Sequence, residues 1–165
     1  MTEWLWTTVR WIHLVAMAFW LGGQLFLILV VRPILRRELD RPQQTTLTAA
    51  LGRRFSPLAW MSLVLLIVTG WLTGEHRGIV WSTLLEPRNT YGRILATKIL
   101  LVALLLLLTL VHGRIFGPRL AALAQSRAPA DRQRYHRLLR LSVVVSALNL
   151  LLTLAIVFLS ARLVA

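Results

Sequence analysis

The sequence predicts an all-α membrane protein, an antiparallel bundle of four transmembrane helices. Of its 165 residues, 57% are hydrophobic and only 15% are charged, whereas soluble domains average about 25% charged. Three apolar stretches, residues 11–31, 94–111 and 141–159, have about the 20 residues that a helix needs to cross some 30 Å of hydrocarbon. A shorter fourth, residues 57–72, extends to residue 76. Backbone amides in lipid must be satisfied internally, so these stretches are predicted to be helices.

We expect the four helices at about residues 4–31, 56–75, 91–113 and 138–161, in a single domain of residues 1–165. The first helix is not predicted to be a removable signal peptide. Glu3 and Arg10 precede its apolar run, which lacks a basic start and is not followed by a small-residue cleavage site. The chain is therefore expected to keep all four spans.

Arginines in the connecting segments predict how the spans are oriented. The first and third connections are strongly basic, with arginines at positions 32, 36, 37, 41, 53 and 54, and at 114, 119, 127, 132, 134, 137 and 140. The positive-inside rule places these connections in the cytoplasm of a bacterium, and both termini and the 74–91 loop outside the inner membrane. The aromatic residues Trp4, Trp6, Trp11, Trp71, Trp81 and Tyr91 then fall at the outer interface.

Composition also excludes several function classes. The chain has no cysteine, so it has no disulfide and no thiolate metal site. The net charge of +13 is explained by topology and by anionic lipid headgroups, and no nucleic-acid recognition motif accompanies it. No nucleophile–base pair, phosphate loop or carboxylate dyad is present, which argues against hydrolysis and phosphoryl transfer. Membrane lipids are the expected partners, with other membrane subunits or further copies of the chain as alternatives.

Polar residues form one face on each predicted helix. The four sets are Arg10, His13, Met17, Trp20 and Gln24; Ser62, Thr69, Thr73 and His76; Lys98, Thr109 and His112; and Ser142, Ser146, Asn149, Thr153 and Ser160. The serines and threonines are expected to bond their own helix backbones, and Asn149 and Gln24 to bond across helices. The bundle interior is therefore predicted to be less apolar than its outer surface.

Ionisable groups inside the spans are functional-site candidates because burying them in lipid is costly. Counting about 1.5 Å per residue, His13 stands about 28 Å above Arg32, His76 about 33 Å above Arg54, and Lys98 about 24 Å above Arg114. These three groups are expected to converge in the outer leaflet. His112 lies only about 3 Å above Arg114 on the same count, near the inner surface and His136.

Imidazoles from facing helices can ligate haem iron in a four-helix frame. The favoured interpretation is therefore a b-type haem protein in membrane electron transfer, with His13 and His76 as axial ligands. The other cofactor-binding candidates are Trp20 against the macrocycle, Arg10 and Lys98 as propionate partners, and His112, which with His136 suggests a second haem. No catalytic residue is assigned.

Two alternatives stay open. Copper is the first, because imidazole binds Cu(II) well, with His13, His76 and Glu75 at an outer entry site. A sulfur-lined Cu(I) path is disfavoured because only Met17 and Met61 follow the initiator methionine. The second alternative is a structural subunit of a larger respiratory or photosynthetic complex, in which the polar faces only pack.

Residues around His13 and Lys98 resemble a known family. Trp11-Ile-His13 followed by Trp20-Leu-Gly-Gly23 resembles the opening helix of CopD-like membrane proteins, and Tyr91-Gly-Arg-Ile-Leu-Ala-Thr-Lys98 resembles their third helix. The same pattern is similar to HemJ, the membrane protoporphyrinogen oxidase family. A CopD likeness implies copper uptake or resistance at the inner membrane, and a HemJ likeness implies haem b with His13 as ligand. Either resemblance implies that His13 and Lys98 are the functional pair.

Overall fold

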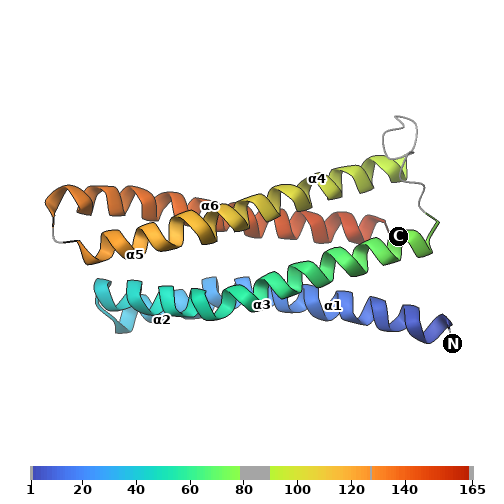
Figure 1. The fold of residues 1–165 in the computed structure, drawn as a ribbon, viewed down its shortest axis with the longest axis horizontal. Helices are drawn as coiled ribbons and strands as arrows, with labels where there is room; N and C mark the ends of the chain where they lie inside the picture. Colours follow the sequence, from blue (N-terminus) through green and yellow to red (C-terminus); the bar gives the residue numbers. More distant parts are fainter. Residues whose placement is uncertain (1, 79–89, 127, 164–165) are drawn as a thin grey trace. The chain divides into compact units, whose positions relative to one another are not determined.

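The computed structural model describes residues 2–78, 90–126 and 128–163, and nearly all of them are helical (Figure 1). This part of the chain contains four helical segments long and apolar enough to cross a membrane, at Glu3–Glu38, Gln43–His76, Thr90–Gln125 and Ala130–Arg162. The prediction of an all-α protein with four membrane-spanning helices is confirmed. Residues 79–89 of the predicted outer loop, with Trp81, lie outside the described residues.

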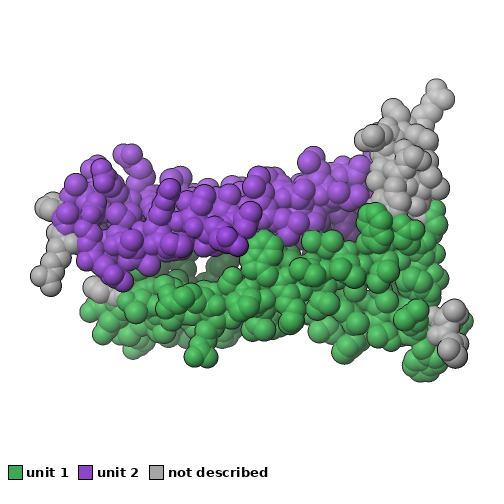
Figure 2. Space-filling view, in the orientation of Figure 1, with its two compact units in different colours: residues 1–79 green, residues 80–165 purple. Residues whose placement is uncertain are grey.

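The chain divides into two compact units, residues 1–79 and 80–165, which are coloured separately in Figure 2. Unit 1 comprises α1 (Thr2–Phe26), the π-helical segment η1 (Leu27–Val31), α2 (Arg32–Glu38) and α3 (Arg41–His76). Unit 2 comprises α4 (Thr90–Val111), the π-helical segment η3 (His112–Phe116), α5 (Gly117–Gln125) and α6 (Pro129–Arg162). In each unit the first long helix packs against the last. The single four-helix domain stays a prediction.

The two units repeat one design. Each has a long helix, a five-residue π-helical segment, a short helix with proline in its first turn, and a helix of 36 or 34 residues that also has proline in its first turn. The π-helical segments begin at residues 27 and 112, an offset of 85. The same offset pairs Trp20 with Leu105, and both side chains are buried. It also pairs His13 with Lys98, the two ionisable groups that the sequence places within the spans.

The helices extend beyond their predicted ends at the arginine-rich side, which corrects the sequence-based boundaries. The second predicted helix starts at Arg41 rather than near residue 56, and the last at Pro129 rather than near residue 138. Hydropathy marks only the apolar part of a helix, whereas capping decides where the helix begins. At α3 the cap is a capping box, in which Gln43 N donates to Asp40 Oδ1 (2.9 Å) and Asp40 N to Gln43 Oε1 (3.3 Å).

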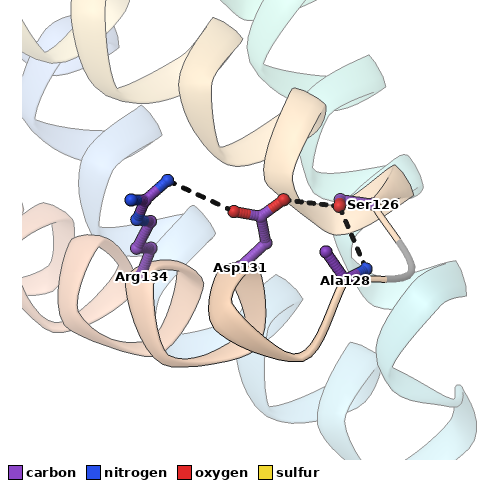
Figure 3. Close-up of polar contacts among 4 residues, drawn as sticks. All are labelled: Ser126, Ala128, Asp131 and Arg134. Atoms are coloured by element: carbon purple, nitrogen blue, oxygen red, sulfur yellow. Dashed lines mark hydrogen bonds and ion pairs between the residues drawn. The ribbon is translucent and has the colours of Figure 1, made fainter.

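At the start of α6 a serine and an acidic side chain hold the turn between α5 and α6 (Figure 3). The Ser126 hydroxyl donates to Asp131 Oδ2 (2.5 Å) and accepts from the Ala128 backbone N–H (3.3 Å). Arg134 lies 3.6 Å from the other carboxylate oxygen of Asp131. The basic segment that contains His136, which the sequence assigns to the third connection, is helical and belongs to α6.

Polar side chains are buried and large apolar side chains are exposed, as expected of helices in lipid. Ser62, Thr69 and Thr153 are nearly inaccessible, while Leu14, Leu100 and Leu151 are more than half exposed. The expectation that serines and threonines bond their own helices is confirmed for Ser62, Thr69, Thr73, Thr109, Ser146, Thr153 and Ser160. The apolar exposed surface is what a bilayer would cover.

Candidate functional site

The most specific polar contact inside unit 1 joins α1 and α3. His13 Nδ1 lies 2.7 Å from Thr69 Oγ1. The Thr69 hydroxyl also lies 2.5 Å from the carbonyl oxygen of Leu65, one turn earlier on α3. Thr69 is 4% exposed and His13 is half-buried, so this short chain of groups connects the two helices by more than apolar packing.

These contacts define the protonation of the imidazole. A hydroxyl has one proton and two lone pairs, and the carbonyl of Leu65 can only accept. Thr69 therefore donates its proton to Leu65 and accepts from His13 Nδ1–H. We assign this tautomer from the hydrogen-bond network. In neutral His13 the second nitrogen, Nε2, then carries the lone pair, which is the arrangement that metal-binding histidines use.

The imidazole lies near Gly70, the residue that follows Thr69 on α3. A Cβ atom at Gly70 would lie 3.7 Å from His13 Cε1, which is ordinary van der Waals distance. A methyl group at position 70 would therefore fit beside the ring without displacing it.

His76 lies elsewhere in unit 1. Its ring stacks on that of Trp6, with centroids 3.8 Å apart and planes inclined by 17°. Trp6 precedes His13 by seven residues on α1, and His76 follows Thr69 by seven on α3. The two imidazoles therefore lie about two helical turns, or roughly 10 Å, apart along the helices. The structure does not bring His13 and His76 to the common level that the sequence predicted.

The other candidates in unit 1 lie at other levels of α1 and α3 than His13. Arg10 lies one turn from His13 towards the N-terminus and is exposed, and Glu75 is exposed at the end of α3. Trp20 is buried, 4% exposed, two turns further along α1. Among the residues that the structure describes, no group of three or more His, Cys, Asp or Glu side chains could hold a metal ion.

Lys98 and His112 belong to unit 2. They lie on one continuous helical segment, 14 residues or about 21 Å apart, so they do not form one site. Lys98 is half-buried in α4. His112 begins η3, and its ring stacks at 5.9 Å on that of Phe116. His136 is exposed on α6.

Sequence reasoning missed the partner of His13. Thr69 was placed on a polar face of its helix but was expected only to bond its own backbone. A signal was present in the sequence. Trp6 and His13 are seven residues apart, and so are Thr69 and His76. Two antiparallel helices that pair His13 with Thr69 therefore also pair Trp6 with His76. The expectation that Asn149 bonds across helices is confirmed, since its Nδ2 donates to Thr109 Oγ1 at 2.8 Å.

Fold and site define a multi-pass helical membrane protein with a tautomer-fixed histidine between two of its helices. The family profile of CopD, copper resistance protein D, matches residues 49–158, two thirds of the chain. The chain therefore belongs to the CopD family, which confirms that resemblance. Thr69, Lys98 and His112 lie inside the matched region and His13 precedes it. The likeness to HemJ stays a resemblance.

One curated relative is an uncharacterized protein of Aquifex aeolicus. It is 46% identical over 61 residues, which are 36% of this chain and 41% of the relative. The alignment thus spans about two fifths of the relative's length. No solved structure matches the chain.

Proposed function

We propose that this protein handles copper ions as cargo in the membrane, with His13 as a ligand through Nε2. The observation that carries the proposal is the hydrogen bond of 2.7 Å between His13 Nδ1 and Thr69 Oγ1. A histidine whose Nδ1–H is held by a neighbouring acceptor presents Nε2 in a fixed orientation, and such second-layer contacts set ligand basicity. Imidazole is a suitable ligand for Cu(II), and membership of the CopD family supports copper.

The donor set fits an ion that binds and leaves. His13 supplies one imidazole, and the described residues form no cluster of three or more such ligands. Transport through a membrane requires sites that bind an ion strongly enough to admit it and weakly enough to release it. A single fixed imidazole with exchangeable further ligands meets that requirement better than a closed structural site does.

Haem b is the second candidate, and the structure favours copper over it. Paired axial histidines must face each other across one iron, whereas His13 and His76 lie about two turns apart in unit 1. Haem would thus need a different second ligand for His13. The tautomer of His13 suits either metal, so the visible absorption spectrum of the purified protein separates the two proposals.

The test is copper binding to full-length protein purified in detergent without a polyhistidine tag. We expect bound copper in the wild type and a loss of most of it in His13→Ala. His136→Ala is the matched control, because His136 is an exposed imidazole on α6 outside the site, and it should bind as the wild type does. Equal copper in all three proteins would overturn the proposal. A Soret band that disappears in His13→Ala would replace copper with haem.

A further inference from the structure

Two buried polar atoms in unit 2 have no hydrogen-bond partner among the described residues. They are Nδ1 of His112 and Oδ1 of Asn149. Asn149 is 9% exposed and lies near the middle of the apolar stretch of α6. Leaving such a group unsatisfied away from water destabilises the folded protein. In native proteins, each such group calls for a specific partner.

The orientation of the Asn149 amide is set by its neighbour. The Thr109 hydroxyl donates to the Leu105 carbonyl oxygen at 2.8 Å, so it has only lone pairs left for Asn149. The group that faces Thr109 at 2.8 Å must therefore be the donor Nδ2. Exchanging the amide oxygen and nitrogen would place two acceptors against each other. Oδ1 is thus an acceptor that needs a proton donor.

His112 lies one turn beyond Thr109, the residue to which the Asn149 amide donates. It follows Thr109 by three residues, which places both side chains on the same helix face in successive turns. His112 also begins η3, which packs against α6. Single π-helical turns inside α-helices occur frequently at functional sites because they displace side chains from the regular face.

The two atoms call for a small ligand that can donate a proton to Oδ1 and either donate to or accept from Nδ1. Water does both and needs only two to four polar partners. A metal ion fits less well, because the amide and the neutral imidazole bring no negative charge to offset the cost of burying a cation. Phe116, stacked on His112, adds an apolar cover.

We propose that unit 2 contains an intramembrane hydration site in which a water molecule bonds His112 Nδ1 and Asn149 Oδ1. The site is independent of the copper proposal in unit 1. It makes His112 an imidazole inside the membrane that exchanges protons with water, towards the arginine-rich end of the helix.

Magic-angle-spinning NMR of the full-length protein in lipid bilayers tests the site by measuring magnetisation transfer from water to labelled side chains. The chain has four histidines, so ¹⁵N-histidine labelling gives four imidazoles, and His112→Phe identifies the signal of His112 by its loss. Asn149 is one of only two asparagines, so ¹⁵N-asparagine labelling reports on transfer from water to the Asn149 amide. The exposed imidazole of His136 serves as the hydrated reference.

We expect rapid transfer from water to His112 and to the Asn149 amide. Asn149→Leu should slow transfer to His112 several-fold and leave His136 unchanged, while Ser160→Ala, another polar deletion on α6, should change neither. If Asn149→Leu does not fold, His112→Phe gives the reciprocal reading, a slowed transfer to the Asn149 amide. Transfer to His112 and Asn149 as slow as to lipid-facing leucine methyls would overturn the proposal. The proposal would also be overturned if transfer to His112 stayed rapid in Asn149→Leu and transfer to the Asn149 amide stayed rapid in His112→Phe.

Discussion

At the scale of single residues, the contact between His13 and Thr69 gives the chain its most specific chemistry. The Thr69 hydroxyl accepts a hydrogen bond from the imidazole Nδ1–H and donates one to its own helix. A lone histidine in a span would be free to adopt either tautomer, and this one is not. The function proposed for the protein therefore depends on Thr69 as much as on His13.

Thr69→Val should weaken copper binding about 10-fold or more, because loss of an outer partner of a ligating histidine typically has that effect. Valine keeps the volume of the side chain and removes the hydroxyl that accepts from His13 and donates to the Leu65 carbonyl oxygen. The matched control is Thr73→Val, since the Thr73 hydroxyl donates to the Thr69 carbonyl oxygen of its own helix at 2.7 Å. A competition titration with a copper chelator measures both. Equal affinities of the two variants would show that Thr69 does not orient a ligand.

Gly23 of α1 leaves space for the ring of Phe55 on α3. A Cβ atom at Gly23 would lie 2.5 Å from Phe55 Cζ, whereas at Gly22 it would meet nothing within 4 Å. We expect Gly23→Ala to lower the free energy of unfolding by about 1–3 kcal/mol through overpacking. Gly22→Ala should be neutral or stabilising, because alanine favours helix by about 1 kcal/mol.

Thermal unfolding in detergent compares the two glycine variants. Phe55→Ala removes the ring atoms that the new methyl group at position 23 would meet. Gly23→Ala should therefore lower the stability of the Phe55→Ala protein less than it lowers the stability of the wild type. If Gly22→Ala and Gly23→Ala lower the unfolding temperature equally, the contact with Phe55 does not limit the residue at position 23.

At the scale of helices, the sequence predicts where the chain crosses the membrane and misses how the helices are aligned. The apolar runs identified all four spans because hydrocarbon imposes a minimum length. The estimate from sequence aligned the first two helices by placing Arg32 and Arg54 at the same depth in the membrane. The contact of His13 with Thr69 shows that they are not, since His13 is 19 residues from Arg32 and Thr69 only 15 from Arg54. That difference of four residues, about 6 Å, comes from helices that continue into the arginine-rich segments, where hydropathy carries no signal.

The turn between α5 and α6 depends on Asp131 more than on its arginine partner. Asp131→Ala removes the bond from Ser126 and an acidic side chain from the first turn of α6. We expect a loss of about 1 kcal/mol, typical of caps. Arg134→Ala should cost less than about 0.5 kcal/mol, because Arg134 is 75% exposed and its ion pair is screened. Chemical denaturation of the two variants measures both, and a larger effect at Arg134 would contradict this ranking.

At the scale of the whole molecule, the chain repeats one helical design. The offset of 85 residues places Lys98 where unit 1 has His13. Thr69 lies as far along the chain from Pro42 on α3 as Ile156 lies from Pro129 on α6, so Ile156 is its counterpart. The side chain of Ile156 cannot accept a hydrogen bond. One copy of the repeat thus has the tautomer-fixed imidazole and the other a cation. Periodicity within single helices could not reveal this, because the repeat appears only when whole units are compared.

The orientation in the membrane is open to direct test because the chain has no cysteine. Arginine-rich connections should face the cytoplasm. We therefore expect a cysteine at Thr7 to react with an impermeant maleimide in intact spheroplasts. A cysteine at Gln133, exposed on α6, should react only after the membrane is permeabilised. The reverse pattern would place the arginine-rich ends outside.

The central claim is that the His13 imidazole, fixed by Thr69, binds copper through Nε2. The most direct measurement is pulsed electron paramagnetic resonance of Cu(II) bound to the tag-free protein, labelled with ¹⁴N- or ¹⁵N-histidine. We predict nitrogen couplings from a bound imidazole that change with the isotope, disappear in His13→Ala and persist in His136→Ala. The same imidazole couplings in His13→Ala as in the wild type would contradict the account.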